Sequence, residues 1–324
     1  MKCDRVGKWM ATMCIAFVVI GCSDDADKSA DASLADVADS ADSSGEQGGD
    51  GPADADVEVD VQVAAGEAHS CAIDGSANLH CWGGNTFGES DPLLGAFEHL
   101  SVGNSHGCAI DITGSLFCWG NNANGRATPP TEGEYVQLSA GSTHSCAIDT
   151  QGALHCWGDG GQGRTEPPEG AFSDVSAGHA HACAIDDAGT LHCWGADIFD
   201  QTNPPEGDFE QVSVGARHSC AIDTGGEIQC WGIELDEDED DDPTDPPAGT
   251  FVELSSGHDH SCAIDESLNL HCWGDNTHGQ ATAPLEQFAQ VSAGVRHTCG
   301  VEVSGEVRCW GDDTQGQLQI DIGE

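Results

Sequence analysis

Basic side chains are scarce in this chain of 324 residues, which has 9 Lys and Arg against 57 Asp and Glu and a formal net charge of -48. No lysine occurs beyond Lys28. A field of one sign this strong repels nucleic acid and anionic lipid headgroups, so we expect neither as a partner. The same field would attract divalent cations or basic ligands, or serve only to keep an exposed protein soluble.

The sequence also lacks catalytic motifs in a fitting context. No zinc-protease helix motif, no phosphate-binding loop and no helical periodicity of useful length occurs. Gly103–Gly107 matches a nucleophile-elbow pattern, but it lies between two expected strands and no helix follows. Gly158–Gly163 matches a dinucleotide fingerprint, but it is a loop after Trp157 and not a strand-to-helix turn. We therefore expect a protein that is not an enzyme.

A targeting segment begins the chain. The positive residues Lys2, Arg5 and Lys8 precede an apolar stretch, Trp9–Ile20, that is too short for a normal membrane span. The stretch ends in Val19–Cys22, which resembles a bacterial lipobox. We predict a lipoprotein signal peptide over residues 1–21, with an ordinary signal peptide as the alternative.

Cys22 is then the expected lipidation site and the first residue of the mature protein. Ser23 follows it, and the resemblance implies that the absence of Asp at this position favours the outer membrane. We expect an envelope lipoprotein, periplasmic or surface-exposed, that touches the membrane through its lipid anchor only.

Residues 22–56 contain no aromatic side chain and are rich in Asp, Ala, Ser and Gly. Such a segment cannot bury enough apolar area to offset the entropy of ordering it. We predict a disordered acidic linker here, followed by a folded domain over residues 57–324.

That domain is built from seven copies of one unit. The half-unit AAGEAHSCAID at Ala64–Asp74 recurs with small changes, and its last copy reads SAGVRHTCGVE. The half-unit LHCWG recurs in the same way, and its last copy reads VRCWG. The period is 37 or 38 residues, with one step of 42, which is typical of a repeat architecture. Three loop residues, usually ending in Gly, separate the second and third expected strands, as in Ile112–Gly114, which predicts a hairpin with a G1 bulge. Short antiparallel sheets repeated in this way favour an all-β propeller.

The unit AGxxHSCAID…GxLxCWGxNxxGQ resembles the regulator of chromosome condensation repeat, and its best copies are Ala140–Gly163 and Ala293–Gln317. The resemblance covers residues 57–324 and implies a seven-bladed β-propeller with three or four strands a blade. The short period is similar to bacterial members, which include a secreted β-lactamase-inhibitor propeller. Eukaryotic members act as guanine-nucleotide exchange factors, which makes a regulator of that kind an alternative function.

Fourteen cysteines form pairs that are always ten positions apart. With a three-residue loop the two cysteines of a pair face each other at a non-hydrogen-bonded site of the hairpin, close enough for a disulfide. Export places them in an oxidising compartment. We predict seven disulfides within blades, each worth about 2–3 kcal/mol in the chain-entropy model. The pairs are Cys71–Cys81, Cys108–Cys118, Cys146–Cys156, Cys183–Cys193, Cys220–Cys230, Cys262–Cys272 and Cys299–Cys309.

A metal site is the competing interpretation of the first hairpin, because His69, Cys71, His80 and Cys81 are close in sequence. The second His is replaced in other repeats by Phe117, Gln229 and Arg308, which argues against it. Three recurring side chains are expected to be structural. They are the histidine before each first cysteine, bonded to neighbouring backbone, the tryptophan after each second cysteine, and the aromatic residue that opens the first strand of six units.

The one irregular element is Glu234–Asp245, a run of carboxylates that makes the 42-residue step. It is either a solvated insertion or a weak calcium site, since hard cations prefer clustered carboxylates. The candidate ligands are Asp236, Asp238, Asp240 and Asp242. We expect no other cofactor.

The blades themselves are occupied with packing, so function is expected on the loops of one face. We expect a monomeric, non-catalytic binding module that engages a protein or an extracellular polymer. A propeller enzyme with a unique site in the channel is the further alternative. The place where non-repeating residues gather distinguishes the two, because a rim favours binding and the channel favours catalysis.

Overall fold

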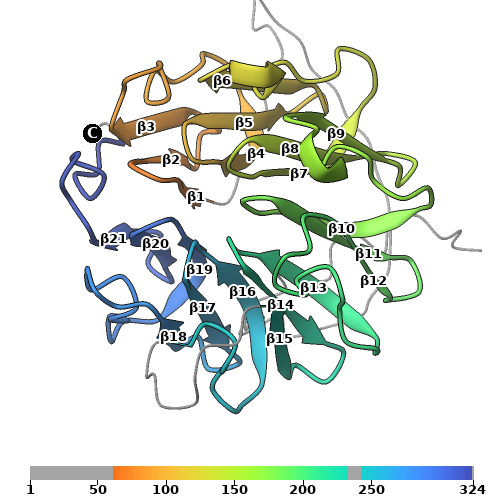
Figure 1. Cartoon of the computed structure of the whole chain (residues 1–324). Coiled ribbons are helices and arrows are strands. Elements are labelled where there is room, and N and C mark those ends of the chain that lie inside the picture. Colours follow the sequence, from red (N-terminus) through yellow and green to blue (C-terminus); the bar gives the residue numbers. More distant parts are fainter. Residues whose placement is uncertain (1–60, 233–241, 323–324) are drawn as a thin grey trace, which may run out of the picture. The chain divides into compact units, whose positions relative to one another are not determined.

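The computed structural model describes residues 61–232 and 242–322, which form seven separate three-stranded antiparallel sheets. The sheets follow one another around a central axis in chain order (Figure 1). The first four blades are β1 (Gln62–Ala65), β2 (His69–Ile73), β3 (Leu79–Gly83); β4 (Phe97–Val102), β5 (His106–Asp111), β6 (Leu116–Gly120); β7 (Tyr135–Ala140), β8 (His144–Asp149), β9 (Leu154–Gly158); and β10 (Phe172–Ala177), β11 (His181–Asp186), β12 (Leu191–Gly195). The last three are β13 (Phe209–Val214), β14 (His218–Asp223), β15 (Ile228–Gly232); β16 (Phe251–Ser256), β17 (His260–Asp265), β18 (Leu270–Gly274); and β19 (Phe288–Ala293), β20 (His297–Glu302), β21 (Val307–Gly311).

The predicted all-β, seven-bladed propeller is confirmed, with three strands in every blade. The only helices among the described residues are two short 3₁₀ turns, η1 (Ala123–Gly125) and η2 (Gly161–Gly163). Within residues 61–232 and 242–322, no helix is long and apolar enough to cross a membrane.

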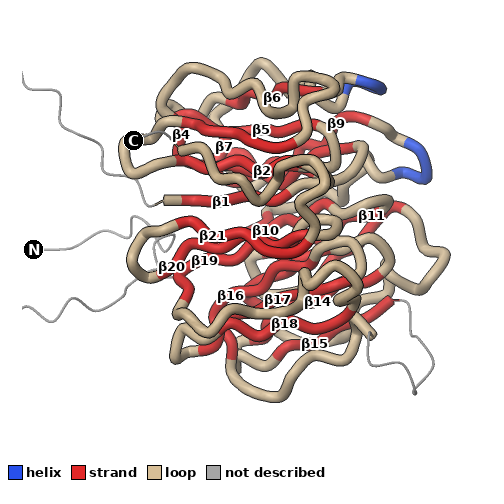
Figure 2. Tube along the Cα trace, turned by 90° about the vertical axis from the view of Figure 1, so that its left-hand side faces the viewer, coloured by secondary structure: helices blue, strands red, loops and turns tan. Residues whose placement is uncertain are grey.

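The two ends of the propeller differ in the loops they carry. One end, here called the turn face, carries the seven Gly-containing turns between the first and second strands and the loops after the third strands. The opposite end, the hairpin face, carries the turns between the second and third strands. Figure 2 shows η1 and η2 at the turn face and the beginning of β1 at the opposite end.

The core lies between neighbouring blades. In one layer, Ile185 and Leu191 of the fourth blade pack against Phe209, Val212 and Val214 of the fifth. The aromatic residues that open the first strands are buried to an exposed fraction of 4% or less, as the sequence predicted. Each indole Nε1 donates to a backbone carbonyl in the loop of the preceding blade, as from Trp119 to Glu89 at 2.9 Å. The tryptophans therefore join blades by a hydrogen bond as well as by packing.

The first strand of each blade is an edge strand, whose N–H groups face the neighbouring blade without a sheet partner. Side chains of the preceding blade accept from them. Ser139 Oγ accepts from the N–H of Ala177 at 2.9 Å, and Ser176 Oγ accepts from Val214 at 3.0 Å. Five more serines or carboxamides repeat the arrangement, so the inner ring is held by directional bonds and not by apolar contact alone.

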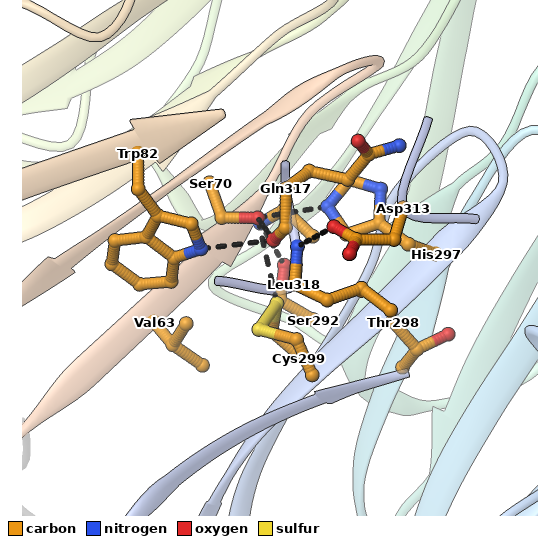
Figure 3. The surroundings of a disulfide bond; sticks show 12 residues. Val63, Ser70, Trp82, Ser292, His297, Thr298, Cys299, Asp313, Gln317 and Leu318 are labelled. Atoms are coloured by element: carbon orange, nitrogen blue, oxygen red, sulfur yellow. Dashed lines mark hydrogen bonds between the residues drawn. A yellow bond between two sulfur atoms is a disulfide. The ribbon is translucent and has the colours of Figure 1, made fainter. Parts of the chain in front are cut away.

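The ring closes between the seventh and first blades with the same contacts. Trp82 Nε1 and Ser70 Oγ both donate to the carbonyl of Gln317, and His297 Nε2 bonds Ser70 Oγ at 2.8 Å (Figure 3). The segment 317–322 lies at this closure, between the seventh blade and the first strand. It adds a strand to neither, since Ile320 and Ile322 pack as side chains in the cluster that also holds Val61.

All seven predicted disulfides are present, each inside its own blade between the second and third strands. The paired residues face each other in the ladder, as Cys108 faces Cys118, and their Cα atoms are 4.0–4.1 Å apart. This is the spacing of the non-hydrogen-bonded site that the three-residue loop predicts.

Candidate binding surface at the channel mouth

Seven glycines build the mouth of the central channel on the turn face. They are Gly66, Gly103, Gly141, Gly178, Gly215, Gly257 and Gly294. A Cβ on any of them would overlap the carbonyl oxygen of the corresponding glycine in the next blade. Backbone bonds run the same way, as from the N–H of Ser142 to Gly178 O at 3.0 Å and from Val295 to Gly66 O at 3.0 Å. Glycine is required here because the turns of successive blades lie in direct contact.

A cavity of about 80 Å³ lies where these turns meet. Its walls are the glycines, the residues that end the first strands, and the residues that follow six of the seven glycines, all but Glu67. The residue after each glycine is not part of the repeated pattern, because its identity changes among the seven blades. In chain order these residues are Glu67, Asn104, Ser142, His179, Ala216, His258 and Val295.

Three of them form a hydrogen-bonded chain across the second, third and fourth blades. Ser142 Oγ donates to Asn104 Oδ1 at 3.0 Å and bonds His179 Nδ1 at 2.9 Å. Ser142 is buried, whereas the imidazole of His179 is exposed to the mouth. Burial of part of the ring, followed by the charges of His258 and Arg164, lowers the pKa of His179 below its ordinary value.

A second chain comes from the fifth and sixth blades. His258 Nδ1 lies 2.6 Å from Asp259 Oδ2, and Arg217 Nη2 lies 2.8 Å from Asp259 Oδ1. Desolvation raises the pKa of Asp259, but the hydrogen bonds from His258 and Arg217 outweigh it and hold this pKa far below its ordinary value. The guanidinium of Arg217 also lies over the ring of Phe199, 5.9 Å from its centre.

The two chains meet over the fifth blade. The imidazoles of His179 and His258 are in edge-to-face contact, with ring centres 5.9 Å apart and an interplanar angle of 73°. Their blades are not neighbours, and the fifth blade between them carries only the buried methyl group of Ala216 at the equivalent position. A small residue there lets the two rings touch.

The arginines gather on this face. The described residues contain five arginines, and Arg126, Arg164, Arg217 and Arg296 lie in the turns and loops at the mouth. Arg126 Nη1 donates to the carbonyl of Ser142, and Arg164 Nη1 donates to Thr143 Oγ1. The exposed side chain of Ile198, next to Phe199, extends the surface outward with an exposed fraction of 72%.

The predicted site residues lie elsewhere or outside the described chain. Cys22, Asp236, Asp238 and Asp240 are outside the described residues. Asp242 is described, and its Oδ1 accepts from the N–H and hydroxyl of Thr244 at 2.8 and 2.7 Å. No group of three or more His, Cys, Asp or Glu within residues 61–232 and 242–322 is placed to hold a metal ion.

The first hairpin does not form the metal site that was the competing interpretation of its residues. Cys71 and Cys81 are bonded to each other, and His80 Nε2 bonds Asp74 Oδ2 at 2.8 Å. His69 is fully buried at the other end of the hairpin, where it faces Gly83. The four side chains therefore do not converge.

The seven histidines that begin the second strands are fully buried, as predicted, but the predicted backbone partner is wrong for them. Five bond a hydroxyl on the next blade at 2.8–2.9 Å, as His106 Nε2 bonds Ser145 Oγ. His69 and His144 have no hydrogen-bond partner at either ring nitrogen. Where the other blades have a hydroxyl, the blade after His69 has Gly107 and the blade after His144 has Ala182. Neither residue has a hydroxyl, which explains both exceptions.

Sequence reasoning overlooked the residues at the mouth. Their signal was the pair of variable positions inside AGxxH, where the rest of the unit is almost constant. Those positions look like spacers until the turns of seven blades are brought to one axis.

Comparison with known proteins agrees with this architecture. A search of curated proteins found no significant match. The ectodomain of the Arabidopsis thaliana receptor kinase ACR4 is similar in structure, with 24% identity and a TM-score of 0.63, over 77% of this chain and 96% of that one. The ectodomain of the Physcomitrella patens receptor kinase CR4 has 24% identity and a TM-score of 0.65, over 78% and 74%. Prp20p from Saccharomyces cerevisiae has 17% identity and a TM-score of 0.61, over 74% and 82%.

These likenesses show the fold, and the family model identifies the repeat. The model of the regulator of chromosome condensation (RCC1) repeat matches seven times, over residues 61–89, 97–126, 135–164, 172–201, 209–234, 251–280 and 288–317. Each match spans one blade, and together they cover well over half of the chain. The protein therefore belongs to the family built from RCC1 repeats.

Proposed function

We propose that this propeller is a non-catalytic module that binds a protein partner on its turn face, around the channel mouth. The observation that carries the proposal is the concentration of non-repeating side chains there. Within the segment AGxxHSCAID, which the blades otherwise repeat almost unchanged, the two variable positions follow the glycine at the mouth.

The chemistry of that surface suits protein recognition. Arg and aromatic side chains are enriched among the residues that contribute most to protein interfaces. Arg217 stacked on Phe199, with Ile198 beside it, supplies such a group, and Asn104, His179 and His258 supply directional polar contacts. Hydrogen bonds already orient Arg217 and both imidazoles, so less conformational entropy is lost when a partner binds.

Relatives in fold support a protein partner in preference to an extracellular polymer. Prp20p has been described with its binding to Gsp1p and histones, and yeast RCC1 (Prp20) has been crystallised with Kap60. Identities of 16–17% carry no activity over to this chain, so we do not adopt the exchange-factor alternative.

We propose the place of action from the sequence. The lipobox at Val19–Cys22 and the disulfide in every blade favour an exported monomer anchored in the bacterial outer membrane. The first described strand begins at the hairpin face, opposite the turn face.

A pull-down from envelope extract tests the proposal. The bait is the disulfide-intact protein, and the variant is Arg217→Ala with Ile198→Ser on the turn face. The matched control is Leu285→Ser, an exposed apolar residue with an exposed fraction of 99% in the loop before β19. We expect the wild type and the control to retain one protein that the variant loses. Equal retention by all three baits, or loss with the control alone, would refute a turn-face partner.

A further inference from the structure

The hydrogen-bond network fixes which ring nitrogen of each mouth histidine carries a proton. Asp259 Oδ2 can only accept, so Nδ1 of His258 donates to it across 2.6 Å. The single hydroxyl hydrogen of Ser142 goes to Asn104 Oδ1, so Nδ1 of His179 donates to Ser142 Oγ across 2.9 Å. In each neutral imidazole the lone pair therefore lies on Nε2.

Neither Nε2 has a hydrogen-bond partner among the described residues. The two rings lie at the mouth of the cavity, in contact with each other over Ala216. Imidazoles bound to one ion at about 2.0–2.1 Å from nitrogen to metal have ring centres roughly 5–6 Å apart. The observed separation of 5.9 Å between the two ring centres falls in that range.

The surroundings match those of a metal-binding histidine. Such a residue almost always donates its second ring N–H to a carboxylate, carbonyl or other acceptor, which fixes the tautomer and raises the basicity of the ligand nitrogen. Asp259 does this for His258, and Ser142 does it for His179. The net charge of the chain, -48, raises the local concentration of divalent cations.

The other histidines are not available for the same chemistry. All 15 lie within the described residues, and the seven that begin the second strands are fully buried. Four more engage their Nε2 with an aspartate: His80, His155, His192 and His271. Only His99 and His278 remain besides the mouth pair, and they lie in different blades.

We propose that His179 and His258 bind one divalent transition-metal ion of the Cu²⁺, Ni²⁺ or Zn²⁺ class through their Nε2 atoms. Imidazole suits these ions, whereas Ca²⁺ and Mg²⁺ prefer oxygen ligands. Residues 61–232 and 242–322 place no third protein ligand there, so solvent is proposed to fill the remaining positions. The site does not depend on the proposed partner, because it is formed by this chain alone.

The test uses Cu²⁺ with the full-length, disulfide-intact protein in millimolar Ca²⁺. Ca²⁺ occupies carboxylate sites and leaves imidazole free. Electron paramagnetic resonance reads the coordinating nitrogens, and titration calorimetry reads the affinity. We expect one bound ion with hyperfine splitting from two imidazoles, and at least about tenfold weaker binding in His179→Gln and in His258→Gln.

His278→Gln is the matched control, because its imidazole is exposed and isolated from other histidines. It should bind Cu²⁺ as the wild type does. Near-ultraviolet circular dichroism confirms that each variant is folded. Wild-type affinity in both mouth variants, or a spectrum with oxygen ligands only, would overturn the site.

Discussion

Two blade interfaces differ from the other five because each lacks the hydroxyl group that bonds the buried histidine elsewhere. A buried imidazole nitrogen without a hydrogen bond carries a desolvation penalty that its paired equivalents avoid. Burial lowers the pKa of His144 to about 3, so the ring stays neutral and still has no partner at either nitrogen. Ala182 occupies the position where Ser145, Ser219 and their equivalents bond the histidine of the preceding blade.

Ala182→Ser should therefore stabilise the protein. The new hydroxyl would form a hydrogen bond with His144 Nε2, as Ser219 Oγ does with His181 Nε2, with a gain of about 0.5–1.5 kcal/mol in the free energy of unfolding. The mirror-image change, Ser145→Ala, leaves His106 unpaired and should destabilise by about 1–3 kcal/mol. Guanidinium denaturation under non-reducing conditions measures both. A loss of stability in Ala182→Ser would mean that the interface cannot accept the hydroxyl.

At the scale of strands and turns, much of the structure could be predicted from the sequence. Each blade contains the hairpin that its three-residue loop predicts, as between β11 (His181–Asp186) and β12 (Leu191–Gly195) in the fourth blade. The loop length fixes the register of each hairpin, and the register places each pair of cysteines opposite one another. These features depend on contacts within one repeat, which sequence periodicity records.

Contacts between repeats could not be predicted in the same way. The histidine partner lies on the next blade, about 38 residues away, and the meeting of His179 with His258 depends on the size of Ala216 in a blade between them. Repeat spacing gives no information about which variable side chains share the axis. The candidate site is built almost entirely from such contacts, so it emerged only with the structure.

The glycine ring gives a prediction about turns. Gly141→Ala should be strongly destabilising, by several kcal/mol, because its Cβ would overlap the carbonyl of Gly178 and force two blades apart. Gly225→Ala is the matched control, since Ala188 already occupies the equivalent hairpin position in the fourth blade. Thermal unfolding of both variants separates them. Equal melting temperatures would show that the turns at the mouth are not in tight contact.

The whole molecule should be sensitive to acid. Burial lowers the pKa of the seven histidines that begin the second strands from 6.5 to about 3 or 4. The unfolded chain therefore binds up to seven more protons than the folded one below pH 6.5, and stability falls as pH falls from about 6.5 towards 4. Denaturation midpoints at pH 7.5, 6.5, 5.5 and 4.5 test this. A midpoint unchanged from pH 7.5 to 4.5 would contradict the burial of neutral imidazoles.

The acidic insertion, Glu234–Asp245, gives a prediction about calcium binding. We expect weak calcium binding by its carboxylates, with an affinity in the range of about 10⁻⁴–10⁻³ M, and no role in folding. The carbonyl of Pro243 accepts from Trp273 Nε1 at 2.9 Å, so a clean deletion removes residues 234–241 and keeps Pro243. The deletion should leave the melting temperature in EDTA unchanged and abolish its rise in millimolar Ca²⁺. If the melting temperature of the intact protein does not rise in millimolar Ca²⁺, the calcium interpretation is wrong and the insertion is only a solvated loop.

The central claim, that a partner docks on the turn face, is tested most directly by photocrosslinking in intact cells. A photoreactive phenylalanine analogue is placed at Ile198 or Arg296 on the turn face, and at Leu94 or Leu285 in the loops that lead into the first strands from the hairpin face. We predict one adduct of defined mass from the two turn-face positions and none from the other two. An adduct confined to Leu94 and Leu285 would place the partner on the opposite face and contradict the account.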